Sequence, residues 1–153
     1  MTSPNPTEQK TFTAFLRKFF AGWLNAIAGF FHRIGLKPNT ITVIGVIGNI
    51  IAGVLVALDR MTWGGLLVLI VVPLDAVDGS LARLRGEESH FGAFFDSVTD
   101  RYSEIALYGG LLIHFYHTNN WRGALLVFFA AFGSIMVSYV RARAESLDFS
   151  AKV

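Results

Sequence analysis

Apolar residues dominate four stretches of the chain, and short polar breaks separate them. The run 41–58 contains only a threonine and an asparagine as polar side chains, and it is just long enough to span a bilayer. The run 121–140 is a second such span. The runs 63–74 and 105–115 are apolar but adjoin acidic residues, so each is expected to be the lipid-facing part of a helix that also carries a polar site. The pattern predicts an all-α, polytopic membrane helix bundle with four transmembrane helices.

The N-terminal part has a different pattern. Residues 11–36 place aromatic and aliphatic side chains at helical spacing among basic residues, which predicts an amphipathic helix on the membrane surface. Packing of part of this helix against the bundle, as a core helix, is equally consistent with the pattern. Residues 1–10 are polar and contain two prolines, so they are expected to form a disordered tail and not a signal peptide.

Composition and charge limit the classes of protein to which the chain could belong. Hydrophobic residues make up 53% of the chain and aromatic residues 14%, which argues against an ordinary soluble domain. The absence of cysteine excludes disulfides and thiolate metal sites, and a net charge of +2 gives no reason to expect nucleic-acid binding. Lysine and arginine gather on one side of the predicted spans, which is therefore expected to face the cytoplasm. That side carries Lys10, Arg17, Lys18, Arg33, Lys37, Arg83, Arg85, Arg141, Arg143 and Lys152, against Arg60 and Arg122 on the other.

Four carboxylates interrupt the apolar pattern. Asp75 and Asp78 are spaced i,i+3, and Asp96 and Asp100 are spaced i,i+4, so each pair lies on one face of its helix. The polar stretch 84–89 reads as a turn between two antiparallel helices, which brings the two faces together. Unpaired, the four carboxylates would repel one another, and such all-oxygen ligands suit Mg²⁺ or Mn²⁺.

The four aspartates have two simpler interpretations, a calcium loop and a solvated acidic turn. A calcium loop needs Asp or Asn at alternate positions before a glycine, and Val77 occupies a ligand position. A solvated acidic turn would not follow directly on the apolar run 66–74. A site for a hard cation, with room for two ions that polarise a phosphoryl group from both sides, is the interpretation that remains.

The spacing Asp-x2-Asp-Gly-x2-Ala-Arg-x8-Gly-x3-Asp-x3-Asp resembles the signature of the CDP-alcohol phosphotransferases, and the resemblance covers residues 37–145. It is filled by Asp75, Asp78, Gly79, Ala82, Arg83, Gly92, Asp96 and Asp100. The resemblance implies a magnesium-dependent integral membrane enzyme, with 37–153 as its catalytic domain. Such an enzyme transfers a phosphatidyl group from CDP-diacylglycerol to a hydroxyl acceptor and releases CMP. It also implies a homodimer in the plasma membrane of a prokaryote.

The resemblance assigns roles to individual residues. It implies that the four aspartates bind metal and that Asp100 is the general base. It implies a donor site of Pro38, Asn39, Thr40, Thr42, Gly79, Ala82, Arg83, Ser89 and Gly92. Capping of the helix that follows by Asn39 or Thr40, and helix packing of the glycines, are simpler roles that the sequence equally allows.

The acceptor site is expected at Arg141 and Arg143, because the segment 138–145 resembles members that use phosphorylated acceptors such as inositol phosphate or glycerol 3-phosphate. Residues two apart on a helix diverge by about 200°, so both arginines cannot point into one pocket without bending, and Arg141 is the preferred candidate.

One feature departs from the family pattern. Family members usually carry six transmembrane helices and this sequence predicts four, so a truncated C-terminus is expected. The sequence therefore allows two alternative functions: the chain could be an inactive truncated homologue, or an intramembrane cation-binding transporter. Retention of all four aspartates argues against the first alternative. A transporter gives no purpose to Gly79, Ala82 and Arg83.

Overall fold

The structure, a computed structural model, describes residues 12–147 and 149. Within them the chain forms helices only, so the predicted all-α class is confirmed. The predicted tail, residues 1–10, lies outside the described residues. The helices are α1 Phe12–Arg33, α2 Pro38–Ala57, α3 Met61–Arg85, α4 His90–His117 and α5 Trp121–Ser146.

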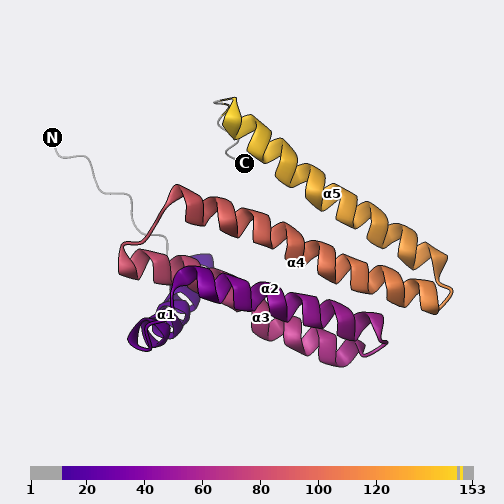
Figure 1. Cartoon of the computed structure of the whole chain (residues 1–153), viewed down its shortest axis with the longest axis horizontal. Coiled ribbons are helices and arrows are strands. Elements are labelled where there is room, and N and C mark those ends of the chain that lie inside the picture. The colour runs from indigo at the N-terminus through magenta and orange to yellow at the C-terminus, as the bar shows by residue number, and fades with distance from the viewer. Residues whose placement is uncertain (1–11, 148, 150–153) are drawn as a thin grey trace.

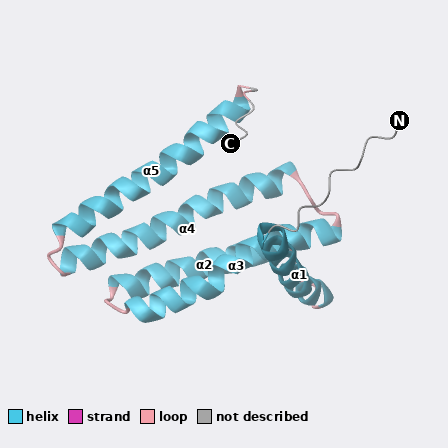
Figure 2. Cartoon of the chain, turned by 180° about the vertical axis from the view of Figure 1, so that it is seen from behind, coloured by secondary structure: helices cyan, strands magenta, loops and turns pink. Residues whose placement is uncertain are grey.

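The long helices run side by side, and α2 is at the centre (Figure 1). α2 packs against α3 on one side and α4 on the other, while α5 packs against α4 alone among the described helices. α1 crosses the end of this array and contacts α3 (Figures 1 and 2). The turn between α3 and α4 lies at the same end of the bundle as α1.

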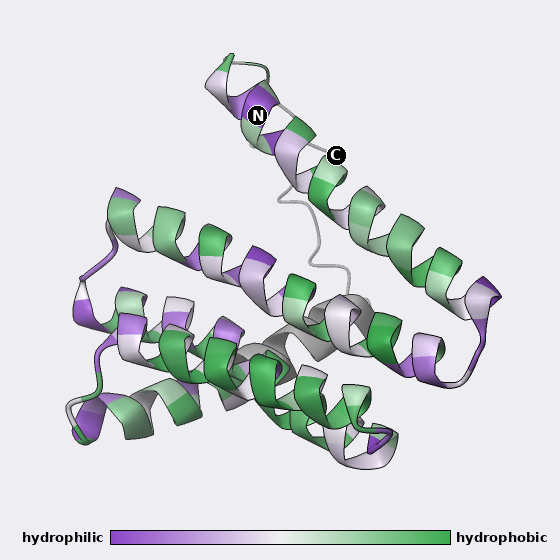
Figure 3. Cartoon of the chain, turned by 45° about the vertical axis from the view of Figure 1, so that its right-hand side comes forward, coloured by the Kyte–Doolittle hydropathy of each residue, from purple (hydrophilic) through white to green (hydrophobic). Residues whose placement is uncertain are grey.

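Three helices of the described chain, α2, α3 and α5, are long and apolar enough to cross a membrane. α4 does not meet this criterion, since its first half carries Asp96, Asp100, Arg101 and Glu104. Figure 3 shows hydrophobic residues along the middle of α2 and α3 and hydrophilic residues at the α3–α4 turn. The prediction of a membrane helix bundle is confirmed, and three of the four predicted spans satisfy the length and composition test.

The helix boundaries correct one prediction. α2 begins at Pro38, with Lys37 in an extended conformation at the N-cap and no side chain capping the helix. Proline suits the first helical position because it lacks the N–H that would otherwise be unpaired there, and its φ is already helical. Asn39 and Thr40 are therefore not caps, which excludes the capping alternative that the sequence allowed.

α1 combines the two arrangements that the sequence left open. Ala28 is fully buried in a core with residues of α2 and α3, and Ile27 and Phe31 pack against that core. Trp23 and Phe30 on the same helix are exposed, at 49% and 60%. One face of α1 thus holds the end of the bundle, and the other is free to lie in a membrane interface.

α2 and α4 approach each other most closely at Gly53 and Gly110. A methyl group added to either glycine would collide with backbone atoms of the other helix, Ala106 opposite Gly53 and Gly53 opposite Gly110. Small residues permit this close backbone packing in membranes. The contact fixes the height of α4 along α2, and with it the position of the acidic end of α4.

We expect Gly110→Ala to lower the free energy of unfolding by about 1–3 kcal/mol, because overpacking against a rigid backbone cannot be relieved by a rotamer change. Gly109→Ala is the matched control, since a methyl group there meets nothing within 4 Å. Without a clash, that change should be neutral or stabilising by up to about 1 kcal/mol. Thermal unfolding in detergent measures both, and equal midpoints for the two variants would contradict the packing described.

Candidate active site

The four aspartates lie at one end of the bundle, two on each of the helices that flank the α3–α4 turn. Asp75 and Asp78 are on α3, and Asp96 and Asp100 are on α4. Asp78 is buried, at 5% exposed, and the other three are partly exposed. Their carboxylates are near enough to repel one another across the gap between the helices. The turn that ends α3 at Gly86, which has φ 64°, therefore achieves the convergence that the spacing predicts.

α2 supplies the wall behind the α3 carboxylates. The hydroxyl of Thr42 donates a hydrogen bond of 2.5 Å to Oδ2 of Asp78. One turn further along α2, Gly45 leaves room for Asp75, because a Cβ on Gly45 would lie 2.7 Å from Oδ1 of that carboxylate. Thr42 is thus more than part of a binding motif: it fixes the rotamer of a buried acid.

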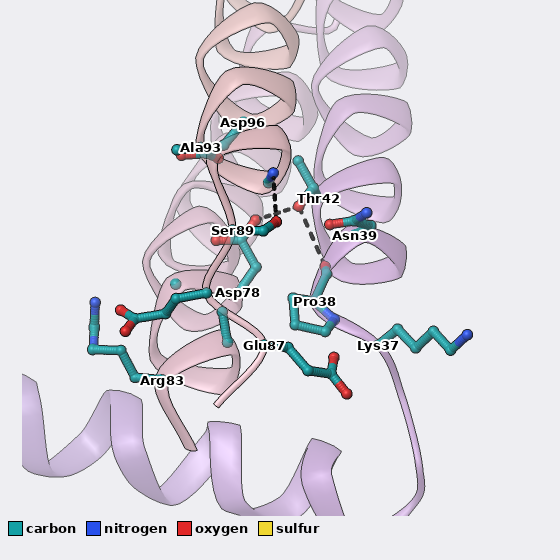
Figure 4. A pocket seen from close by; sticks show the side chains of 14 residues that line it. Lys37, Pro38, Asn39, Thr42, Asp78, Arg83, Glu87, Ser89, Ala93 and Asp96 are labelled. Carbon is teal, nitrogen blue, oxygen red and sulfur yellow. Dashed lines mark hydrogen bonds between the residues drawn. The ribbon is translucent and has the colours of Figure 1, made fainter. Parts of the chain in front are cut away.

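A cavity of about 330 Å³ opens beside these acids, between the start of α2, the end of α3 and the start of α4 (Figure 4). It contains two of the aspartates and eight of the nine residues expected to bind the donor. From that expected set it is lined by Pro38, Asn39, Thr42, Asp78, Gly79, Ala82, Arg83, Ser89, Gly92 and Asp96.

Thr40 is the exception among the expected donor residues. It is exposed and does not line the cavity. Two residues along a helix rotate the side chain by about 200°, so when Thr42 faces Asp78 its neighbour Thr40 faces away. A role for Thr40 at the donor site therefore stays a prediction that this cavity does not support.

The small residues of the cavity have distinct roles. Only the Arg83 guanidinium comes within 4 Å of a Cβ built on Gly79, so helix packing does not explain that glycine, and its absent side chain keeps the cavity wall flat. Gly92 instead belongs to the N-terminal cap of α4. Its backbone N–H donates a hydrogen bond of 3.0 Å to the hydroxyl of Ser89, the N-cap residue. The hydroxyl hydrogen of Ser89 remains free to donate into the cavity.

Several lining residues were missed by sequence reasoning. The cavity is completed by four further residues, Lys37, Glu87, Glu88 and Ala93. In the sequence, only their position next to the expected donor residues indicated that they would line it. A second cavity, of about 540 Å³, joins Asn25 of α1 to the acids of α3 and α4. No motif marked Asn25, because its contribution depends on how α1 crosses the bundle.

Arg141 and Arg143 lie at the end of α5, apart from both cavities described. Both are exposed, and Nε of Arg141 lies 3.6 Å from Oε1 of Glu145 on the same helix. The structure does not bring these arginines against the carboxylates. Their role at the acceptor site therefore stays a prediction.

The acids fit a hard divalent cation by chemistry. All four offer carboxylate oxygens, only Asp78 among them has a hydrogen-bond donor opposite it, and Asp100 has a single weak ion pair, 3.8 Å from Arg101. In the described part of the chain, no three acidic or histidine side chains converge as ligands around a common point. A bound cation would offset the mutual repulsion of these acids.

Comparison with known proteins identifies the family. The sequence model of the CDP-alcohol phosphatidyltransferases matches residues 36–152, most of the described chain. The chain belongs to the CDP-alcohol phosphatidyltransferase family. The match begins just before Pro38 and includes both pairs of aspartates, so the signature and the site geometry concern the same residues.

Several curated relatives are named as phosphatidylinositol phosphate or archaetidylinositol phosphate synthases. A phosphatidylinositol phosphate synthase of Streptomyces avermitilis is 38% identical over 143 residues, covering 91% of this chain and 58% of that protein. One of Cutibacterium acnes is 36% identical over 148 residues, covering 90% and 69%. An archaetidylinositol phosphate synthase of Pyrococcus horikoshii is 35% identical over 116 residues, covering 73% and 57%.

Solved structures of a Mycobacterium tuberculosis family member share the fold. The phosphatidylinositol phosphate synthase PgsA1 with CDP-DAG bound aligns with a TM-score of 0.76 at 30% identity, over 82% of this chain and 64% of that one. The same enzyme in complex with manganese and citrate aligns with a TM-score of 0.75 at 30% identity, over 80% and 60%. The chain thus spans about six tenths of the length of these solved structures. The manganese in the second structure supports use of a divalent cation by this fold.

Proposed function

We propose that this chain carries the catalytic site of a membrane transferase that moves a phosphatidyl group from CDP-diacylglycerol to a hydroxyl of a polyol phosphate and releases CMP. The observation that carries the proposal is the cavity at the α3–α4 turn, where Asp78 of α3 and Asp96 of α4 lie among eight of the nine residues expected to bind the donor. Inositol phosphate is the preferred acceptor, because the relatives are named phosphatidylinositol phosphate synthases.

Asp75, Asp78, Asp96 and Asp100 would hold the divalent cation, Mg²⁺ in the cell with Mn²⁺ as a substitute, and two ions is the count we propose. When bound, the metal neutralises the donor diphosphate and stabilises the charge on departing CMP. Asp78 is kept in position for this by Thr42. Gly79 and Ala82 would give the nucleotide a flat wall, and Arg83, which also lines the cavity, would pair with a donor phosphate.

The reaction needs one proton acceptor. As the acceptor hydroxyl oxygen forms its bond to phosphorus, the bond between phosphorus and the CMP oxygen breaks, and the hydroxyl proton must leave. Asp100 is the carboxylate we assign to take it, because the family resemblance implies this role, and it is partly exposed and does not line the nucleotide cavity.

The phosphate of the acceptor needs its own partner. We assign it to Arg141, with Arg143 as the second candidate, because α5 returns to the end of the bundle that holds the acids and carries these arginines in its last turns. Among the described residues, Arg141 forms one ion pair, which is weak and exposed, with Glu145. A phosphate dianion would compete for that guanidinium through bidentate hydrogen bonds.

The membrane placement follows from charge. α4 packs along α2 and is proposed as the fourth span, with its charged half facing the bundle interior. Lys37, Arg83 and Arg141 lie at the acidic end, and Arg60 and Arg122 at the other, so we propose that the site faces the cytoplasm of a prokaryotic cell. A homodimer is proposed from the family resemblance alone.

An acceptor screen tests the proposed reaction. The purified chain in liposomes with CDP-diacylglycerol and Mg²⁺ is supplied in turn with inositol phosphate, glycerol 3-phosphate, inositol and serine, and the lipid product is identified by mass spectrometry. We expect phosphatidylinositol phosphate. A different phosphorylated lipid would overturn the acceptor assignment alone. Lipid product from inositol or serine would overturn the role of Arg141, and cation flux without lipid product would favour a transporter.

Thr42→Val is expected to lower the rate of CMP release about tenfold. It removes the hydroxyl that holds Asp78, and a hydrogen bond to a buried charged group contributes about 1.5–3 kcal/mol. Thr42→Ser retains the hydroxyl and should restore most of the rate. Steady-state rates at saturating donor compare the two variants. A wild-type rate in Thr42→Val with a loss in Thr42→Ser would show that the methyl group, not the hydrogen bond, is what the site needs.

A further inference from the structure

A group of polar side chains joins α4 to α5 directly beside the proposed base. We call Arg101, Glu104, Ser134 and Ser138 the α4–α5 polar network. The Arg101 guanidinium donates a short hydrogen bond to the hydroxyl of Ser138 and lies 3.0 Å from Oε1 of Glu104. The hydroxyl of Ser134 donates to Oε2 of Glu104 at 2.7 Å. Both serines belong to an otherwise apolar stretch of α5, and neither was assigned a role by the sequence.

This network supplies the side-chain hydrogen bonds between α4 and α5 within the described residues. Among the described helices α5 packs against α4 alone, and only 6% of its most apolar stretch is buried within the structure. Apolar contacts between helices give little preference for one position over another when lipid is the alternative, whereas interhelical hydrogen bonds favour one register. Two such bonds one turn apart on α5 therefore set how far α5 extends along α4.

The network also has a fixed relation to the chemistry. Arg101 follows Asp100 in sequence, and its Nη2 lies 3.8 Å from Oδ2 of that carboxylate. Ser138 precedes Arg141 by one turn on α5. The same guanidinium thus contacts the proposed base on its own helix and the helix that ends in the proposed acceptor arginines.

We propose that the α4–α5 polar network is a positioning device, which holds the cytoplasmic end of α5 at the correct distance from Asp100 for the acceptor phosphate to be bound. This inference rests on the proposed function and extends it to residues outside both cavities. Arg101, Glu104, Ser134 and Ser138 act through Asp100 and Arg141 and are positioning residues, not catalytic ones.

Kinetics with the double variant Ser134→Ala/Ser138→Ala test the proposal. We expect KM for the acceptor to rise about tenfold, the effect of losing two interhelical hydrogen bonds of the usual strength in membranes, with KM for CDP-diacylglycerol unchanged. Ser134→Thr/Ser138→Thr retains both hydroxyls and should restore the acceptor KM. An equal rise in both KM values, or an unchanged acceptor KM, would overturn the proposal.

A distance measurement separates this proposal from the reaction itself. The chain has no cysteine, so spin labels go only to engineered cysteines at the exposed positions Phe91, at the start of α4, and Leu147, just after α5. The distance distribution should broaden in the double alanine variant and stay narrow in His114→Gln, which breaks a different contact, between α4 and Asp59 in the α2–α3 turn. Equal distributions would overturn the proposal even if the chain released no CMP, whereas wild-type inactivity alone would count against only the proposed function.

Discussion

Asp100→Asn is expected to lower the rate of CMP release by about 10³-fold, which lies within the usual contribution of a positioned general base. The amide preserves the shape of the side chain and its contact with Arg101, but it cannot accept the proton of the attacking hydroxyl. Because the three remaining aspartates and the nucleotide cavity are unchanged, binding of the CDP-linked donor should weaken far less than turnover. Single-turnover rates and a donor titration measure the two quantities separately.

Asp59→Asn is the control for this experiment. Asp59 is a carboxylate at the opposite end of the bundle, where it contacts Nδ1 of His114 at 2.6 Å. Its amide variant changes the net charge by the same amount and should turn over at the wild-type rate. A loss of less than tenfold in Asp100→Asn would assign the base to another group, and equal losses in the two variants would show a general effect of charge or folding.

Asp78→Asn should weaken divalent-cation binding by at least about 100-fold. Removal of a residue that merely supports a metal ligand already costs roughly 10- to 100-fold in affinity, and Asp78 is proposed as a ligand itself. It is the most buried of the four acids, so water cannot easily replace it. Mn²⁺ titration in the presence of CDP, followed by electron paramagnetic resonance, measures the affinity directly.

The amide variant at position 78 can keep its contact with Thr42, since the side-chain oxygen still accepts the hydroxyl, so the fold should persist. Asp59→Asn again serves as the comparison and should bind Mn²⁺ like the wild type. Unchanged Mn²⁺ affinity in Asp78→Asn would remove this residue from the proposed metal site. Loss of affinity together with a lower thermal midpoint would point to unfolding as the cause.

The spacing of the aspartates was sufficient to predict the acidic end of the site. Helical periodicity places Asp75 on the same helix face as Asp78, and Asp96 on the same face as Asp100. The turn 86–89 is short, so the two helices that it joins lie antiparallel. The family signature then led to the correct cavity residues around Gly79 and Arg83. Local pattern succeeds here because the site is built from neighbouring elements.

Long-range register could not be predicted in the same way. The hydrogen bond from Thr42 to Asp78 joins residues 36 positions apart, and that from Arg101 to Ser138 joins residues 37 apart. Both depend on how far one helix slides along another, which is set by contacts such as Gly53 against Gly110. Thr40 lies outside the cavity for the same reason, since its orientation follows from the face of α2 that Thr42 presents to α3.

Acceptor-dependent release of CMP is the measurement that tests the central claim most directly. The purified chain in liposomes is given CDP-diacylglycerol, with and without inositol phosphate, in Mg²⁺ and then in excess chelator, and CMP is quantified. The proposed transferase predicts release that requires both the acceptor and the metal and that disappears in Asp100→Asn. Release that is indifferent to acceptor and metal, or no release although CDP and Mn²⁺ both bind, would contradict it.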